Sequence, residues 1–206
     1  MRTTHHLAGI VCAMLASGLA LPATAEEKES GFFFNVGTGV NWAEDVDIEV
    51  AGVSSTADLD VGIRVAVGGG YNINKYLGVG FETGYIWNGF DGNDNSLSHL
   101  PGMFNGELRI PNVSKLEPYL GGGIGGSWNI LYVDGSGGND WDVDSDFNFA
   151  WQATGGVRYK FVRNMSLGIG YKYFGTSSSD YHINGTNPHI GTSNNHTLNV
   201  AFNMMF

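Results

Sequence analysis

Apolar and polar side chains alternate along most of the chain after residue 30, with the period of two that an extended strand gives. The last ten residues show the pattern well, since one face of the strand carries Leu198, Val200, Phe202, Met204 and Phe206. The opposite face is small or polar, with Met205 as its one exception. Such alternation is typical of a strand that is apolar on one side and polar on the other.

The same alternation predicts eight strands. They are expected at residues 32–42, 59–71, 76–87, 100–110, 118–130, 147–161, 165–173 and 196–206. A tilted strand of about 9–11 residues crosses a bilayer, and each segment meets that length.

A soluble β-sandwich also alternates, so two further features decide between the classes. The apolar face is too aromatic and too continuous to lie in water, while the opposite face carries charge and glycine, as an enclosed polar lumen would. The connections also alternate in length: residues 72–75, 111–117 and 162–164 are short, and residues 43–58, 88–99, 131–146 and 174–195 are long. Short turns on one side and long loops on the other are typical of outer-membrane barrels. The sequence therefore predicts an all-β protein, an eight-stranded antiparallel up-and-down transmembrane β-barrel.

The first 25 residues have the features of a secretory signal peptide. Arg2 supplies a positive charge, an apolar run follows, and Ala23-Thr24-Ala25 is a small-x-small cleavage site. We expect residues 1–25 to be removed and residues 26–206 to form the barrel domain. Cys12, the single cysteine, lies in the signal, so no disulfide is expected in the mature chain.

Several segments resemble the eight-stranded outer-membrane β-barrel superfamily, of the opacity-protein and OmpA-transmembrane-domain kind. They are residues 31–37, 80–85, 117–125, 155–161, 170–173 and the terminal strand. The resemblance implies a monomer in the cell outer membrane after export, in contact with membrane lipid and lipopolysaccharide. It also implies that the barrel-assembly machinery recognises the C-terminal strand through Phe202, Met204 and Phe206.

Charge and composition exclude some partners. The formal net charge is -10, and a chain this acidic lacks the clustered Lys and Arg that nucleic-acid phosphates require. Aromatic residues make up 13% of the chain and recur throughout it, which argues against disorder. No cofactor, metal ligand set or catalytic residue is predicted.

Among the charged residues predicted to face the lumen, Glu82 and Glu107 are expected to pair with some of the cations and to plug the lumen, because unpaired charges in a narrow barrel are costly. The charged residues predicted to face the lumen are Arg64, Glu82, Glu107, Arg109, Arg158, Lys160 and Lys172. Large aromatic residues near strand ends are expected to form girdles at the two membrane interfaces. They are Trp42, Tyr71, Tyr76, Trp87, Trp128, Tyr159 and Tyr173.

The function is expected in the external loops, as a structural or adhesion-type role toward a host or matrix ligand, because loops on a rigid scaffold commonly carry binding. A narrow ion or solute channel is the alternative, and a lipid-A-modifying enzyme is the third reading. The acidic segment 134–146 starts like a calcium loop but lacks the required Gly and the final Glu, which favours a solvated loop. The segment with His182, His189 and His196 lacks a convincingly spaced Ser and acid, which favours a polar loop over catalysis.

Overall fold

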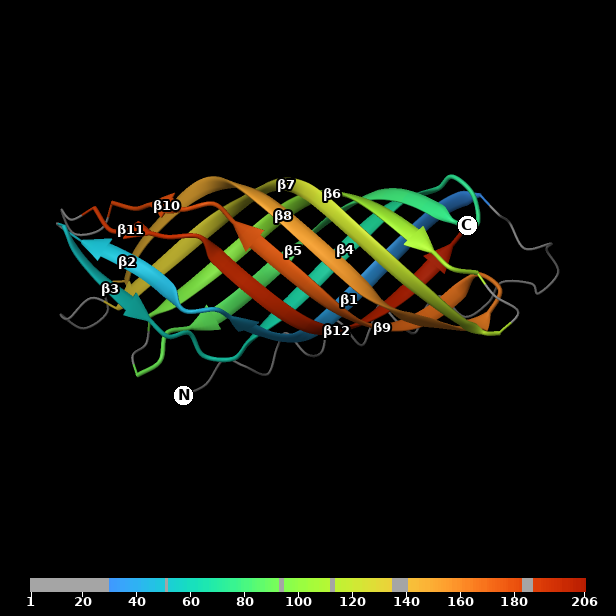
Figure 1. The fold of residues 1–206 in the computed structure, drawn as a ribbon, viewed down its shortest axis with the longest axis horizontal. Coiled ribbons are helices and arrows are strands. Elements are labelled where there is room, and N and C mark those ends of the chain that lie inside the picture. The colour runs from blue at the N-terminus through green and yellow to red at the C-terminus, as the bar shows by residue number, and fades with distance from the viewer. Residues whose placement is uncertain (1–29, 51, 93–94, 112–113, 135–140, 183–186) are drawn as a thin grey trace.

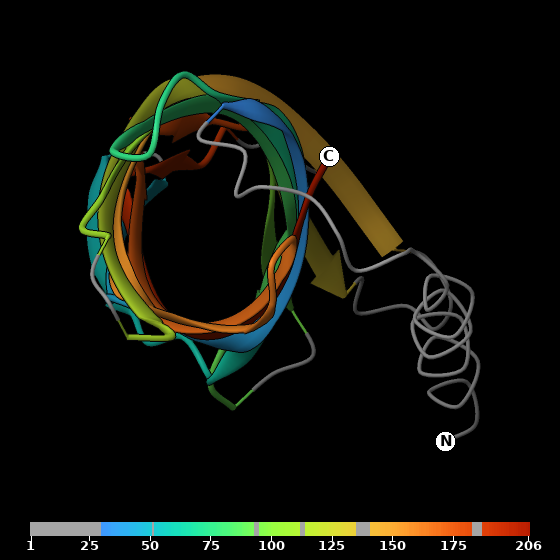
Figure 2. The ribbon, with the colours of Figure 1, turned by 90° about the vertical axis from the view of Figure 1, so that its right-hand side faces the viewer.

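The computed structural model describes residues 30–50, 52–92, 95–111, 114–134, 141–182 and 187–206. Within them, eight long strands close into an antiparallel barrel in the order β1-β12-β9-β8-β7-β6-β5-β4. Their bounds are β1 Gly31–Ala43, β4 Gly62–Asn72, β5 Leu77–Gly89, β6 Ser96–Arg109, β7 Leu116–Asp134, β8 Trp141–Val162, β9 Met165–Thr176 and β12 Ser193–Met205. Figure 1 shows these strands inclined to the long axis, and Figure 2 shows the closed ring from one end.

The first and last barrel strands pair with each other, and this closes the ring. Phe34 lies opposite Met204 and Val36 opposite Phe202, so matching residues of the two apolar faces stand side by side. The backbone N–H of Phe206 donates to the Phe32 carbonyl at 2.8 Å. Closure leaves the barrel with no unpaired strand edge, the feature that otherwise promotes aggregation.

The outward face of the barrel is a continuous apolar surface. Phe104 is 69% exposed, Leu120 63% and Ile169 62%, and similar side chains follow around the ring. The inward face carries small and polar residues, and glycine lets bulky side chains enter. Tyr119, for example, lies over its partner Gly156 on the neighbouring strand. A Cβ added at Gly156 would stand 2.8 Å from the hydroxyl oxygen of Tyr119. A β-barrel that exposes its apolar face and encloses its polar face is built for lipid surroundings.

All eight predicted strands are present, but several run further toward the end of the barrel that bears the long connections. There β7 and β8 pair out to Asp134 and Trp141, so most of the expected loop 131–146 is a strand extension. The predicted strands were too short, because these extensions lie beyond the stretch of alternating apolar and polar residues that is long enough to cross a membrane.

Two of the expected long loops are also partly folded. Residues of the first and last connections form a second sheet in the order β10-β11-β2-β3, from β2 Val46–Val50, β3 Val53–Ala57, β10 Ser179–Asp180 and β11 His189–Ile190. This small sheet lies at one end of the barrel in Figure 1. The expected long connections 43–58 and 174–195 are therefore partly strands.

No helix among the described residues is long and apolar enough to span a membrane. The predicted signal peptide, residues 1–25, lies outside the described residues.

Candidate functional site

The lumen contains a central ion cluster whose charged side chains come from three strands and which a fourth strand joins through an amide. Glu82 on β5 accepts hydrogen bonds from Arg64 on β4 at 3.0 Å and from Lys172 on β9 at 2.7 Å. Gln152 on β8 joins the cluster, because its Oε1 accepts from the Arg64 guanidinium at 3.0 Å and its Nε2 donates to Asn105 at 2.6 Å. Arg64 and Lys172 are both buried. A buried charge needs such a partner, so the cluster ties four strands together across the lumen.

A second group of charges lies nearer the short turns. Arg158 donates to both carboxylate oxygens of Glu107, and its guanidinium stands 4.2 Å from the centre of the Tyr119 ring. Lys160 Nζ lies 2.6 Å from Glu117 Oε2. Glu117 was not predicted as a lumen residue because it was assigned to a turn, whereas β7 already includes it. These two ion pairs join β6, β7 and β8.

Arg109, the remaining predicted lumen charge, does not join these pairs. It forms no ion pair with any described residue. Its Nη2 instead donates to the backbone carbonyls of Asn74 at 2.6 Å and Leu77 at 3.3 Å, in the adjacent short turn. Arg109 is therefore not among the lumen cations that pair with Glu82 or Glu107.

An apolar layer lies across the lumen beyond the central cluster. Ile86, Met103, Ala150 and Phe174 pack together there and are completely buried. The Arg64 guanidinium lies 5.4 Å from the centre of the Phe174 ring, so the ion cluster and the apolar layer are in contact. The sequence reading of a purely polar lumen missed this layer, because a few apolar side chains on inward positions do not disturb the period of two.

A layer of amides, hydroxyls and one histidine follows. Asn41 donates to Asn88 at 2.7 Å and to Asn195 at 2.8 Å, while His99 bonds Asn129 at 2.8 Å and Ser193 at 3.3 Å. The order Ser193–His99–Asn129 has the connectivity of a hydrolase triad. All three side chains are buried between two apolar layers, however, so a substrate has no route to them. We assign this layer a structural role in holding the barrel strands together.

The folded loops form a cap over this end of the barrel. Val46, Phe90, Leu97, Leu131, Tyr181 and Ile190 form its apolar core, with Ile48, Ala57, Leu59 and Val133 packed against it. Burial raises the pKa of the Tyr181 hydroxyl to about 12. The cap residues come from all four segments that the sequence predicted as long connections, including the parts of these segments that extend β6 and β7. The lumen is thus closed at this end by a packed core.

The external histidines and carboxylates singled out in the sequence make several separate contacts at the surface. His189 Nδ1 lies 2.7 Å from Asp180 Oδ1, and His182 donates its backbone N–H to Asp144 at 2.6 Å. Asp146 accepts from the Asp180 backbone N–H at 3.0 Å. Asp144 and Asp146 thus anchor the last connection onto β8. Among the described residues, no three His, Cys, Asp or Glu side chains are grouped as metal ligands would be.

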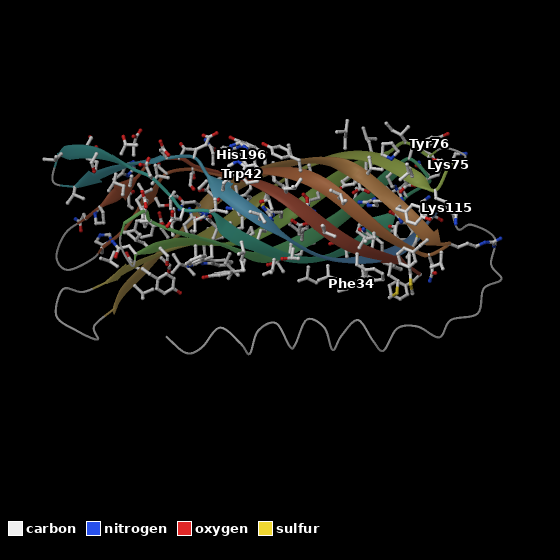
Figure 3. The ribbon with its side chains drawn as sticks, turned by 90° about the horizontal axis from the view of Figure 1, so that it is seen from below. Phe34, Trp42, Lys75, Tyr76, Lys115 and His196 are labelled. Carbon is white, nitrogen blue, oxygen red and sulfur yellow. The ribbon has the colours of Figure 1, made fainter. Side chains whose placement is uncertain are left out.

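His196 lies on the outside of the barrel with several predicted girdle residues. It stacks on Trp42 at 6.1 Å between ring centres, bonds the Tyr171 hydroxyl, and lies 3.0 Å from Glu44. Hydrogen bonds from Asn194 and then His196 lower the pKa of Glu44. Figure 3 shows Trp42 and His196 close together about midway along the molecule, with Tyr76, Lys75 and Lys115 near its right-hand end.

The aromatic residues predicted for the girdles lie on outward positions. Trp42, Tyr71, Tyr76, Trp87, Trp128 and Tyr159 are exposed. The side chain of Tyr173 is partly buried and donates to Asn194 at 2.8 Å. Their placement at both ends of the apolar surface is compatible with interfacial contacts, which stays a prediction. Phe202 and Met204 pair with β1, while the assembly role of the terminal residues also stays a prediction.

This fold defines a transmembrane β-barrel, with an apolar outer surface and a closed ring of eight strands. The model of the outer membrane protein beta-barrel domain matches residues 11–206, and the chain belongs to that family. The protein is accordingly an outer-membrane protein. Following the rule for such barrels, we call the end with short turns periplasmic and the end with the cap external.

Solved structures show the same fold. Neisserial surface protein A is 19% identical, with a TM-score of 0.55, covering 86% of this chain and 99% of that one. OprG from Pseudomonas aeruginosa is 13% identical, with a TM-score of 0.57, covering 90% of this chain and 100% of that one. The outer membrane protease OmpT from Escherichia coli is 8% identical, with a TM-score of 0.51, covering 89% of this chain and 99% of that one. At such identities the likeness concerns the fold alone. A comparison with curated proteins gave no match.

Proposed function

We propose that this protein is a sealed outer-membrane barrel that acts through its external cap, in a surface-interaction role. The observation that carries the proposal is the completely buried apolar layer of Ile86, Met103, Ala150 and Phe174 between the ion cluster and the cap. Ions and polar solutes do not cross a packed apolar layer, because they would lose their hydration without compensation. This favours the surface role over the channel.

The cap is suited to such a role by its rigidity and its charge. Its small sheet and apolar core hold the β2–β3 hairpin in place, so a partner meets a preorganised surface. Residues 44–61, 88–99, 131–146 and 174–195 contain fourteen Asp and Glu and no Lys or Arg. Asp45, Asp47 and Glu49 are exposed on or beside β2. The matching partner surface is therefore basic, since opposite charges steer and align association.

Conductance of the protein in a planar bilayer tests the seal. We expect a silent bilayer from the folded wild type, with folding confirmed by the heat-modifiable gel band. A double variant, Ile86→Ala with Phe174→Ala, is measured beside the wild type. It truncates the largest aliphatic and the largest aromatic side chain of the apolar layer. Reproducible conductance steps from the wild type would make the protein a channel and reject the proposal.

Binding to intact cells that display the protein tests the charge argument. Fluorescent poly-lysine and fluorescent heparin are the two probes. We expect saturable poly-lysine binding that falls in the triple variant Asp45→Asn, Asp47→Asn and Glu49→Gln. The matched control, Ser54→Ala with Ser55→Ala, alters exposed residues of the same hairpin without changing charge. Stronger binding of heparin than of poly-lysine would contradict a basic partner.

A further inference from the structure

The periplasmic end of the lumen is hollow, in contrast to the capped end. A cavity of about 210 Å³ lies there, between the short turns and the ion pairs of Glu107 and Glu117. Its wall includes residues of all three short turns, among them Lys75, Pro111 and Arg163. The cavity therefore faces the periplasm and lies outside the layers that seal the barrel.

The lining of the cavity carries an excess of positive charge. Five of the chain's ten Lys and Arg side chains line it, namely Lys75, Arg109, Arg158, Lys160 and Arg163. The two lining carboxylates, Glu107 and Glu117, already lie in ion pairs with Arg158 and Lys160. In a protein with a formal charge of -10, this concentration of cations stands out. A cleft lined by one sign of charge concentrates counter-ions within it.

Arg109 gives the cavity a specific feature. Its Nη2 is held by two turn carbonyls, which fix the guanidinium at the cavity wall. Its Nε is buried and has no hydrogen-bond partner among the described residues. A buried donor without a partner is costly and rare in folded proteins, so the hydrogen bonds of this guanidinium are incompletely satisfied, and an anion at the cavity wall would add an acceptor to it.

We propose that this cavity binds the phosphate or carboxylate group of a periplasmic molecule, with Arg109 as its main contact. The lysines and Arg163 add long-range attraction, and Phe33, Met204 and Met205 offer an apolar wall to the rest of the ligand. The planar guanidinium of an arginine can bind either a phosphate or a carboxylate through two N–H donors at once. Such a site would face the periplasm while the acidic cap faces outward.

The test is calorimetric titration of the full chain in detergent with inorganic phosphate. We expect saturable binding by the wild type, weakened about tenfold or more in Arg109→Gln, because a charge-assisted hydrogen bond contributes this order of affinity. Lys115→Gln is the matched control. Lys115 is an exposed cation at the same end of the barrel, and it does not line the cavity. Its loss should therefore change the affinity for phosphate by less than about twofold.

A second variant separates binding from folding, since Arg109 also supports the adjacent turn. Ser166 lines the cavity and its side chain makes no hydrogen bond with a described residue. Ser166→Asp places a carboxylate in the cavity without removing a described contact, and we expect it to weaken phosphate binding as Arg109→Gln does. Each variant must first show the heat-modifiable band of a folded barrel.

Two lipid compositions distinguish the source of the anionic group. The same titration is done in nanodiscs of phosphatidylcholine and of phosphatidylglycerol. Phosphate binding in both supports a soluble ligand. Binding in phosphatidylcholine that is lost in phosphatidylglycerol supports a lipid headgroup at the same site, because the anionic lipid then competes with phosphate. The proposal is overturned if the wild type shows no saturable binding, or if Lys115→Gln weakens binding as much as Arg109→Gln.

Discussion

The two ends of this barrel differ in both packing and charge. At the external end, folded connections cover the lumen with an apolar core and present only negative formal charge. At the periplasmic end, short turns leave a cavity lined mostly by cations. The same eight strands run between them, so the strands themselves do not impose the difference. It arises from the connections, whose length allows a second sheet at one end only.

This difference shows where a sealed barrel can carry function. The middle of the lumen is largely filled by side chains that bond one another, and the cavity beside Arg64, Glu82 and Lys172 is only about 30 Å³, which leaves room for little more than water. The surfaces that we propose for partners are the cap and the periplasmic cavity, and their opposite charges would favour different partners. Substitutions in the centre should therefore change stability, whereas substitutions at either end should change binding.

The largest effect is expected from Glu82→Ala, which removes the one carboxylate of the central cluster. Arg64 and Lys172 would then be buried without an anion, and breaking a buried pair in this way costs about 3–5 kcal/mol. The measurement is the urea midpoint of unfolding in lipid vesicles. Asp45→Ala is the control, because it removes an exposed carboxylate at the cap. Equal stability of wild type and Glu82→Ala would show that the cluster does not hold the barrel together.

A smaller effect is expected from Ile190→Val in the cap core. Ile190 is completely enclosed by the cluster of Val46, Phe90 and Tyr181, and loss of a buried methylene costs about 0.5–1.5 kcal/mol. Protease resistance of the cap at fixed temperature is the readout, because local opening of the cap exposes cleavage sites. Val53→Ala on the exposed hairpin edge should leave the digestion rate unchanged. Equal rates for both variants would mean that the cap is not packed as described.

The smallest effect concerns pH and the external surface. Because hydrogen bonds from Asn194 and His196 lower the pKa of Glu44 in the folded protein, its ionised form is favoured by folding. That contribution is complete above the ordinary pKa of a glutamate and is lost as pH falls through the lowered value. We expect Glu44→Gln to remove a small part of the acid dependence of stability below about pH 4.3, the ordinary glutamate pKa. Parallel acid-unfolding curves for Glu44→Gln and wild type would contradict this contribution.

The candidate site was predictable only in part. The inward charges could be named because they fall on the polar face of an alternating strand, as Arg64 and Lys172 do. Glu117 was missed because it lies at a strand start beside a proline. His99 and Phe174 were missed because nothing in their local sequence shows that they meet across the lumen, where their rings lie 5.7 Å apart. Contacts of this kind depend on which strands become neighbours.

The sequence by itself determined the eight strands of the barrel, the face that each turns to lipid, and the end at which each charged residue lies. These follow from alternation and from connection length, which are local properties of the chain. The tertiary structure alone decided that Glu82 meets partners 18 and 90 residues away, and that residues near Val46 and Ile190 join in one sheet. The physical reason is closure of the ring: only when β1 pairs with β12 do the first and last connections come together and cover the lumen.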